Sequence, residues 1–333
     1  MNKLVRFTHA GLALLFALTG LLSAARVGAQ VQGGPANQNG GLALKPAKLR
    51  ADASQHMLLG AARAGSRIVA VGEHGVILLS DDDGAHFRQA SVPTDSTLNS
   101  VSFSDAKHGW AAGHWGVILK TEDGGETWSL QRSDTTTDQP IFSIAFRDAK
   151  HGWAVGLWAL VLSTDDGGVT WKQQALDQSS KSGGSGLNLY SVFIGDDQSV
   201  YVAGEQGTVF KSTDGGVSWR AQPTGYKGSL WSGAATADHV IYVGGLRGNL
   251  FASSDGGESW KAIRAGVGDS ITDIKAEKDE VVAVALDGSV ITRRAGQSSF
   301  KVSREAGRGA LTAVAIARTG APVLFSKEGV VKN

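Results

Sequence analysis

The stretch KSTDGGVSW, Lys211–Trp219, decides the fold, because near copies of it return along the chain. Further copies end at Phe87, Trp128, Trp171, Trp260 and, in a degenerate form, at Phe300. Successive copies lie 40 to 48 residues apart, a period typical of repeated supersecondary units. A catalytic motif is rarely needed several times, so the recurrence indicates a structural role.

One full repeat, Leu98–Gln131, contains four short runs of β-branched and aromatic residues separated by polar or glycine-containing turns. This pattern is typical of a four-stranded antiparallel meander. The same layout fits Met57–Ala90, Ile141–Gln174, Leu189–Gln222, Ser229–Ile263 and Ser270–Ser303. The sequence therefore predicts six complete four-stranded blades of a β-propeller.

The last part of the repeat region, Ala310–Lys332, supplies only three strand-like runs. A ring of blades has to close, because an open ring exposes sheet edges that favour aggregation. We predict an all-β, seven-bladed propeller over residues 57–333, preceded by an N-terminal segment at 30–56. Within that segment Leu42–Leu49 is the candidate strand that completes the seventh blade.

Residues 1–29 have the features of a secretory signal peptide. Lys3 and Arg6 precede an apolar run from Ala10 to about Leu22, which is too short to span a bilayer, and small residues precede Gln30. We predict cleavage before Gln30 and export to the periplasm or an equivalent lumen. The mature protein is expected to be a monomer that is not inserted in the membrane.

Composition excludes several classes of function. Residues 1–29 carry three basic and no acidic side chains, so their removal changes the formal net charge from +1 to −2. This charge argues against nucleic acid as a partner. The chain has no cysteine, which excludes disulfides, thiol catalysis and thiolate metal sites.

The recurring DGG turn has a structural interpretation. Its aspartate is expected to accept hydrogen bonds from turn N–H groups, its glycines to adopt positive φ, and its tryptophan to pack between blades. The aspartates are Asp82, Asp123, Asp166, Asp214 and Asp255, and the tryptophans are Trp128, Trp171, Trp219 and Trp260.

Metal and cofactor sites are not predicted. The sequence SDDDG at Ser80–Gly84 resembles the start of a calcium loop, but Val92 stands where that loop requires glutamate. His74 and His114 occupy equivalent hairpins, yet two histidines without an added carboxylate make a weak zinc site.

Three tryptophans do not belong to the repeat core. Trp115 and Trp158 fall in the hairpin between the second and third strands, on the face opposite the DGG turns, and Trp231 begins a first strand. Phe142 and Tyr190 hold the position of Trp231 in the two preceding blades. These aromatic residues predict a partner-binding patch, although rings that merely fill space under loops would give the same pattern.

Cationic residues are expected at the edge of this patch. Arg247 lies in the fifth-blade hairpin, and Lys227 and Arg264 lie in nearby loops. Aromatic anchors with a polar rim are typical of binding hot spots in protein interfaces.

The repeat resembles a known sequence family. S/T-x-D-x-G-x-S/T-W is the Asp-box, or bacterial neuraminidase repeat, and the fuller pattern with DAKHGWAVG resembles the photosystem II stability and assembly factor family over Met57–Asn333. The resemblance implies a seven-bladed propeller that binds a newly made photosystem II reaction-centre subunit. For this chain it predicts a non-catalytic factor that binds a membrane-protein complex or an exported protein.

A glycoside hydrolase or a glycan-binding propeller is the alternative, because the Asp-box also occurs in sialidases and other glycoside hydrolases. A sialidase needs an arginine cluster, a tyrosine nucleophile beside a glutamate, and an aspartic acid, and Tyr190 and Tyr226 have no glutamate adjacent in sequence. A two-carboxylate glycosidase stays open. Its candidate carboxylates, in equivalent hairpins, are Glu73, Glu205, Asp287 and Glu328.

Overall fold

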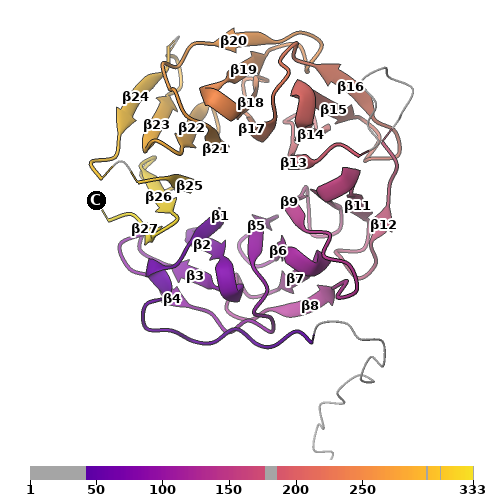
Figure 1. Cartoon of the computed structure of the whole chain (residues 1–333), viewed down its shortest axis with the longest axis vertical. Coiled ribbons are helices and arrows are strands. Elements are labelled where there is room, and N and C mark those ends of the chain that lie inside the picture. The colour runs from indigo at the N-terminus through magenta and orange to yellow at the C-terminus, as the bar shows by residue number, and fades with distance from the viewer. Residues whose placement is uncertain (1–42, 177–185, 298, 308, 333) are drawn as a thin grey trace, which may run out of the picture. The chain divides into compact units, whose positions relative to one another are not determined.

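Seven antiparallel sheets stand side by side around a central channel (Figure 1). The computed structural model describes residues 43–332 except 177–185, 298 and 308. The chain divides into two units, Met1–Gly40 and Gly41–Asn333, and the sheets all belong to the second. The prediction of a seven-bladed β-propeller is confirmed, with six blades of four strands and a last blade of three.

Within each blade the strands follow one another from the channel outward. In blade order they are β1 (Leu58–Ala64), β2 (Arg67–Gly72), β3 (Ile77–Ser80) and β4 (Arg88–Gln89); β5 (Leu98–Phe103), β6 (Gly109–Gly113), β7 (Ile118–Thr121) and β8 (Ser129–Arg132); β9 (Ile141–Phe146), β10 (Gly152–Gly156), β11 (Val161–Thr164) and β12 (Lys172–Gln173); β13 (Leu189–Ile194), β14 (Val200–Gly204), β15 (Thr208–Ser212) and β16 (Arg220–Pro223); β17 (Leu230–Ala235), β18 (Ile241–Gly245), β19 (Leu250–Ser253) and β20 (Lys261–Ile263); β21 (Ile271–Glu277), β22 (Glu280–Ala285), β23 (Ser289–Arg293) and β24 (Lys301–Arg304); β25 (Leu311–Ile316), β26 (Pro322–Ser326) and β27 (Gly329–Val330).

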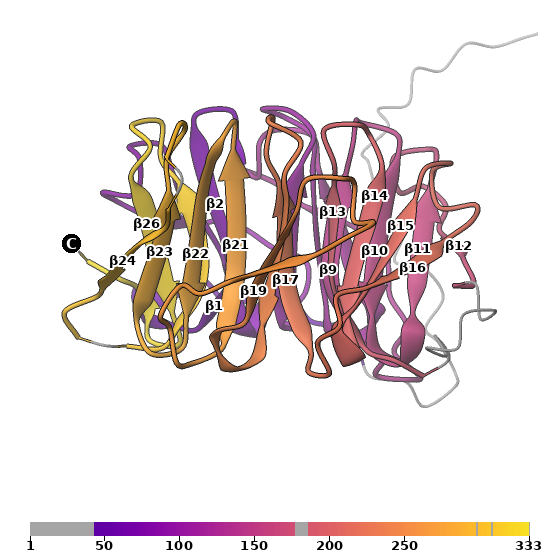
Figure 2. The same ribbon diagram turned by 90° about the horizontal axis from the view of Figure 1, so that it is seen from above.

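The turns lie on two opposite faces of the ring (Figure 2). One face carries the first-to-second and third-to-fourth strand turns, and we call it the Asp-box face. The other, the hairpin face, carries the turns between second and third strands. Five of these hairpin turns are single 3-10 turns, and a sixth 3-10 turn, η1, precedes the first blade. They are η1 (Ala53–Gln55), η2 (Glu73–Gly75), η3 (His114–Gly116), η4 (Leu157–Ala159), η5 (Glu205–Gly207) and η6 (Leu246–Gly248).

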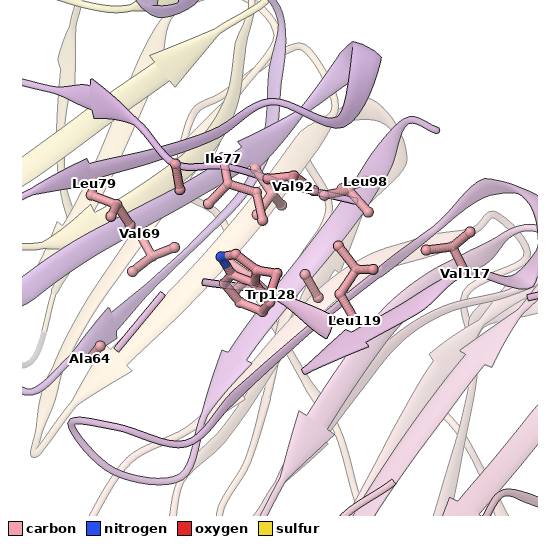
Figure 3. Packing of buried hydrophobic residues seen from close by; sticks show 13 residues of the cluster. Ala64, Val69, Ile77, Leu79, Val92, Leu98, Val117, Leu119 and Trp128 are labelled. Carbon is pink, nitrogen blue, oxygen red and sulfur yellow. The ribbon is translucent and has the colours of Figure 1, made fainter. Parts of the chain in front are cut away.

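The core consists of interfaces between neighbouring blades. Figure 3 shows the cluster between the first and second blades, in which the Trp128 ring lies near Val69 and Leu79 from the first blade and Leu119 from the second. The second strands of the blades are buried on both faces, so they read as nearly continuous apolar runs such as RIVAVG in β2.

A β-bulge occurs at the same place in the first strand of every blade. Each bulge inserts one extra residue near the start of the first strand. The first strands line the channel, so the extra residues lie where the channel opens on the hairpin face. The extra residues are Leu59, Asn99, Phe142, Tyr190, Trp231, Thr272 and Thr312. An extra residue has no partner in the ladder, so its side chain is available for other contacts.

The predicted closing strand is absent from the part of Leu42–Leu49 that the structure describes. Residues 43–49 form no strand, and Ala47 N–H donates to the Val92 carbonyl at 3.0 Å, beside the first blade. The apolar side chains of Leu44 and Ala47 pack against the core between the first two blades, which holds the segment there. Leu42, together with the signal peptide expected at 1–29, lies outside the described residues.

The seventh blade instead meets the first through side chains. Leu58, Ile68, Ala313 and Phe325 share one buried cluster, and the Thr312 hydroxyl donates to the Leu58 carbonyl. No helix within the described ranges is long and apolar enough to cross a membrane.

Candidate partner-binding site

The Asp-box turn of Lys211–Trp219 is held by its own side chains. The Ser218 N–H donates to Asp214 Oδ1 at 2.9 Å, and the Ser212 hydroxyl donates to the same oxygen at 2.8 Å. Gly216 N–H donates to Ser212 Oγ at 2.7 Å. The hydrogen bonds from the Ser218 side chain and backbone lower the pKa of Asp214 to about 2.

Each complete Asp-box is also fastened to the blade before it. A donor near the start of the preceding second strand reaches the carbonyl oxygen of the first box glycine. The pairs are Arg67 Nη1 to Gly124 (3.1 Å), Trp110 Nε1 to Gly167 (3.0 Å), Trp153 Nε1 to Gly215 (2.9 Å) and Tyr201 hydroxyl to Gly256 (3.3 Å). The polar groups of the Asp-boxes thus form hydrogen bonds within the turn and between blades. We therefore place the candidate binding site on the hairpin face.

Three aromatic side chains meet on the hairpin face, at the mouth of the channel. Phe142 and Tyr190 are stacked with ring centroids 5.6 Å apart, and the Trp231 ring lies 6.5 Å from that of Tyr190. All three are bulge residues of consecutive blades, so the bulge brings them together. They line a cavity of about 500 Å³ formed by the first strands, and each is half-buried. We call this set the aromatic arc.

The same bulge position is polar in three of the other four blades and is Leu59 in the first. Asn99 Nδ2 donates to the Ile141 carbonyl at 2.8 Å, and the Thr272 hydroxyl donates to the Leu311 carbonyl at 2.8 Å. Each of these side chains joins its blade to the next. Phe142 has no side-chain donor and cannot form such a hydrogen bond to the next blade. At this position the arc has exposed ring surface where other blades have a structural hydrogen bond.

Tyr190 also contacts a carboxylate that its sequence neighbours do not reveal. Its hydroxyl lies 3.3 Å from Glu205 Oε1, and Glu205 accepts the N–H and Nδ2 of Asn188 at 3.1 and 3.0 Å. Burial first, and then the charge of Glu205, raise the pKa of Tyr190. The position of Glu205 in the repeat could have predicted this contact. Glu205 is the first residue of the hairpin turn after β14, and β14 pairs with β13, the strand that carries the Tyr190 bulge.

The other predicted patch residues stand apart from the arc. Trp115, Trp158 and Arg247 occupy the middle of their hairpin turns with φ near +57°, a left-handed conformation that bulky residues rarely adopt. Trp115 packs against the core of the first two blades, whereas Trp158 is 58% exposed. Arg247, Lys227 and Arg264 are exposed. Of the six predicted residues, the structure therefore gathers Phe142, Tyr190 and Trp231.

The hairpin turn of the third blade, η4, has one further departure. Ala159 follows Trp158 with φ +56°, at the place where the other four turns of this type have glycine. Two successive non-glycine residues in left-handed conformation make this turn the most strained of the five.

Histidines on this face are paired locally. His114 Nδ1 lies 3.2 Å from Asp138 Oδ2, and the His74 ring packs edge-on against His56. In the part of the chain that the structure covers, no three His, Asp or Glu side chains gather in a group able to hold a metal ion.

Two overlapping stretches, 80–139 and 131–308, match the family described as Photosynthesis system II assembly factor YCF48, and together they cover more than half of the chain. The chain belongs to this family. Curated relatives include the chloroplastic Photosystem II stability/assembly factor HCF136 of Cyanidioschyzon merolae, 49% identical over 47 residues, and that of Guillardia theta, 45% identical over 42 residues. These matches cover 14% and 12% of this chain and 11% of each relative.

Solved structures of YCF48 are similar along most of this chain. A structure described as YCF48 bound to D1 peptide has a TM-score of 0.67 at 15% identity, covering 86% of this chain and 94% of that one. YCF48 from Cyanidioschyzon merolae has 0.65 at 18%, covering 87% and 97%. A streptogramin B lyase is equally similar, at 0.68 and 12%, covering 86% and 96%. At these identities the likeness shows the fold alone.

Proposed function

We propose that this protein is an exported, non-catalytic assembly or stability factor that binds a partner protein through its hairpin face. The observation that carries the proposal is the aromatic arc. Three large rings from consecutive blades converge at the channel mouth and stay half-exposed, where three of the other four blades have small polar side chains. Clustered aromatic side chains on a rigid surface are typical anchors of protein interfaces.

The partner proposed is a segment of a membrane-protein complex or of another exported protein. Membership of the YCF48 family supports this, and the family member described as bound to D1 peptide supports a polypeptide ligand. A propeller suits the task, because its closed ring fixes the arc in place and little ordering entropy is lost on contact. Export to the periplasm rests on the signal-like features of residues 1–29.

The test is a pull-down from native membranes with the wild type beside Phe142→Asn, Tyr190→Thr, Trp231→Thr. Asn and Thr are the residues that three of the other blades carry at this bulge, so the fold is expected to survive. We expect the triple variant to lose a partner that the wild type retains, identified by mass spectrometry and re-bound in purified form. The control is Trp158→Ala, which removes an exposed ring outside the arc. Equal recovery by wild type and triple variant would refute this site.

A glycosidase is the second candidate, because the contact between Tyr190 and Glu205 resembles the tyrosine and glutamate of a sialidase. Two observations weigh against it. The raised pKa of Tyr190 opposes formation of the phenolate nucleophile. A sialidase also needs a cluster of arginines, and among the described residues that line the cavity Arg63 is the one arginine. Arg63 lies near the end of β1, close to the Asp-box face, and pairs with Glu277 at 3.2 Å.

The other hairpin carboxylates have local partners. Glu73 accepts Met57 N–H at 3.3 Å, and Asp287 lies 3.4 Å from Arg304 Nη2. Glu328 lies 3.5 Å from Lys327 Nζ. Each of these contacts fits the structural interpretation of a hairpin residue.

Assay of the purified protein against aryl glycosides and sialosides decides between the two candidates. We expect no turnover. Hydrolysis that is lost in both Tyr190→Phe and Glu205→Gln, with an unchanged melting temperature, would establish the enzyme instead. Glu73→Gln serves as the matched control for a hairpin carboxylate outside the arc.

A further inference from the structure

Tyr190 is the middle ring of the aromatic arc, and its position depends on contacts outside the strand ladder. Its ring is the one that lies beside both Phe142 and Trp231. As a bulge residue, Tyr190 has no partner in the ladder. The position of this ring therefore decides whether the arc presents three rings as one surface.

One carboxylate supplies the contact that holds Tyr190. The Tyr190 hydroxyl donates to Glu205 Oε1 at 3.3 Å. Glu205 is itself held by Asn188, whose N–H donates to Oε2 at 3.1 Å and whose Nδ2 donates to Oε1 at 3.0 Å. The Glu205 N–H donates back to the Asn188 carbonyl at 3.1 Å. Because three hydrogen bonds join Asn188 to Glu205, the carboxylate has little freedom to move.

Asn188 is also tied to the preceding blade. Its Oδ1 accepts the Trp158 N–H at 3.2 Å, and the neighbouring Leu187 carbonyl accepts the Ala159 N–H at 2.8 Å. Trp158 and Ala159 are the left-handed residues of η4. The side-chain amide of Asn188 thus uses its oxygen on the third blade and its nitrogen on the fourth, which fixes the orientation of the amide.

The first blade has a similar hairpin without a tyrosine to hold. Glu73 begins its turn as Glu205 does, and among the five 3-10 hairpin turns these two begin with glutamate. The Met57 N–H donates to Glu73 Oε1 at 3.3 Å, and the Glu73 N–H donates to the Met57 carbonyl at 3.1 Å. The bulge residue of that blade is Leu59, which has no hydroxyl. The fourth blade therefore adds two side-chain donors to a backbone contact that both blades share.

We propose that Glu205, held by Asn188, is a positioning residue for the aromatic arc. It fixes the Tyr190 ring between Phe142 and Trp231, so the partner meets a preformed surface and little freedom of the rings is lost on binding. Burial, and then the charge of Glu205, raise the pKa of Tyr190, which keeps its hydroxyl protonated and able to donate. The effect on a partner rests on the proposed function, whereas the position of the ring is a property of the free protein.

Exchange of donor and acceptor tests the network. Glu205→Gln alone places an amide nitrogen where Asn188 donates, and Asn188→Asp alone places a second carboxylate against Glu205. Each single change is expected to break the contact and release Tyr190. In the double variant the new amide donates to the new carboxylate and to the Tyr190 oxygen, and its own oxygen still accepts the N–H of residue 188. We therefore expect the double variant to restore the ring position.

The first measurement reports on the free protein through Phe142, whose ring is stacked 5.6 Å from that of Tyr190. The chain has eleven phenylalanines, so labelling with 4-fluorophenylalanine allows the Phe142 fluorine NMR signal to be assigned from Phe142→Leu. Tyr190→Thr gives the signal of a lost stack. We expect each single variant to move the Phe142 signal toward that position and the double variant to return it toward the wild type.

Glu73→Gln is the matched control, because it makes the same change in the equivalent hairpin of the first blade, and it is expected to leave the Phe142 signal unchanged. If a single variant fails to fold, Tyr190→Phe removes the hydroxyl alone and is expected to displace the signal in the same way. An unchanged Phe142 signal in the single variants, or a double variant no closer to the wild type than they are, overturns the proposal.

The second measurement is the affinity for the partner recovered in the pull-down. We expect each single variant to bind it about three- to tenfold more weakly, as the loss of one hydrogen bond implies, and the double variant to bind within about twofold of the wild type. Wild-type affinity in single variants whose Phe142 signal is displaced would show that the ring position does not affect binding, and would overturn the proposal.

The two measurements separate this inference from the proposed function. Equal partner recovery by the wild type and the aromatic-arc triple variant refutes the arc as the binding site. The fluorine measurement needs no partner, so it still decides whether Glu205 positions Tyr190.

Discussion

The junction between the third and fourth blades and the junction between the seventh and first are built from different contacts. At the first, Trp153 is 2% exposed and its Nε1 donates to the Gly215 carbonyl at 2.9 Å. At the second, Val323 packs against the Asp-box, and Asp83 replaces the box glycine and pairs with Arg318 at 3.0 Å. At this position of the blade, the junction between the third and fourth blades has a buried aromatic ring, and the closing junction has a smaller aliphatic side chain beside an exposed ion pair.

The difference in exposure predicts a difference in strength. A fully buried large side chain stabilises a fold by about 1.5–3 kcal/mol or more, whereas an exposed ion pair contributes about 0–1 kcal/mol. The closing junction also lacks a fourth strand. We therefore expect the ring to open there first, because of the missing fourth strand and not because of its buried cluster, which is as large as those at other junctions.

The largest expected effect comes from truncating the two equivalent core positions. Trp153→Ala is expected to lower the free energy of unfolding by about 3–5 kcal/mol, and Val323→Ala by about 1–2 kcal/mol, because much less surface is lost at the closing junction. Urea denaturation followed by circular dichroism measures both. Equal losses would mean that the two junctions are equally strong.

A smaller effect is expected from acid. Hydrogen bonds from Ser218, Thr170 and Ser259 lower the pKa values of Asp214, Asp166 and Asp255 from 3.8 to about 2. Since the folded pKa is the lower one, the stability from these boxes is present above about pH 4 and is lost as the pH falls toward 2.

Asp214→Asn isolates one box. The variant is expected to have a lower melting temperature at pH 7, and its melting temperature is expected to fall less steeply between pH 4 and pH 2 than that of the wild type. Parallel pH curves for the two proteins would show that Asp214 does not stabilise the fold through its charge.

The smallest effect is expected from the closing ion pair. Arg318→Ala is expected to cost about 0–1 kcal/mol at low salt and nothing measurable at 1 M NaCl, because Arg318 is exposed and screened. Asp83→Gly also removes the pair but relieves the positive φ of Asp83, so it is expected to be less harmful than Arg318→Ala. A loss from Arg318→Ala that is independent of salt would contradict this account.

Much of the fold could be predicted from the repeat alone. The period placed the six complete blades, and the alignment of Trp231 with Phe142 and Tyr190 predicted that these rings share a face. Such inferences succeed because every copy of a repeat meets nearly the same neighbours. The hydrogen bonds of the Asp-box turns were also predictable, because they join residues within one copy of the repeat.

Contacts between segments that are distant in the sequence could not be predicted from the repeat. Leu44 and Ala47 pack on the first two blades, which the alternating pattern of Leu42–Leu49 does not reveal. The contact of Tyr190 with Glu205 depends on the bulge register. Trp115 and Trp158 share a turn position but differ in exposure, because only Trp115 finds a core to pack against.

The first-strand bulges have a consequence for how such proteins diversify. Each of the seven extra residues lies outside the backbone ladder, but Asn99, Thr272 and Thr312 use their side chains to hydrogen-bond the next blade. Natural or designed variants can therefore present different chemistry at the other four positions, Leu59, Phe142, Tyr190 and Trp231, on an unchanged scaffold. A library randomised at those four positions alone is expected to keep a high proportion of folded members while sampling new ligands.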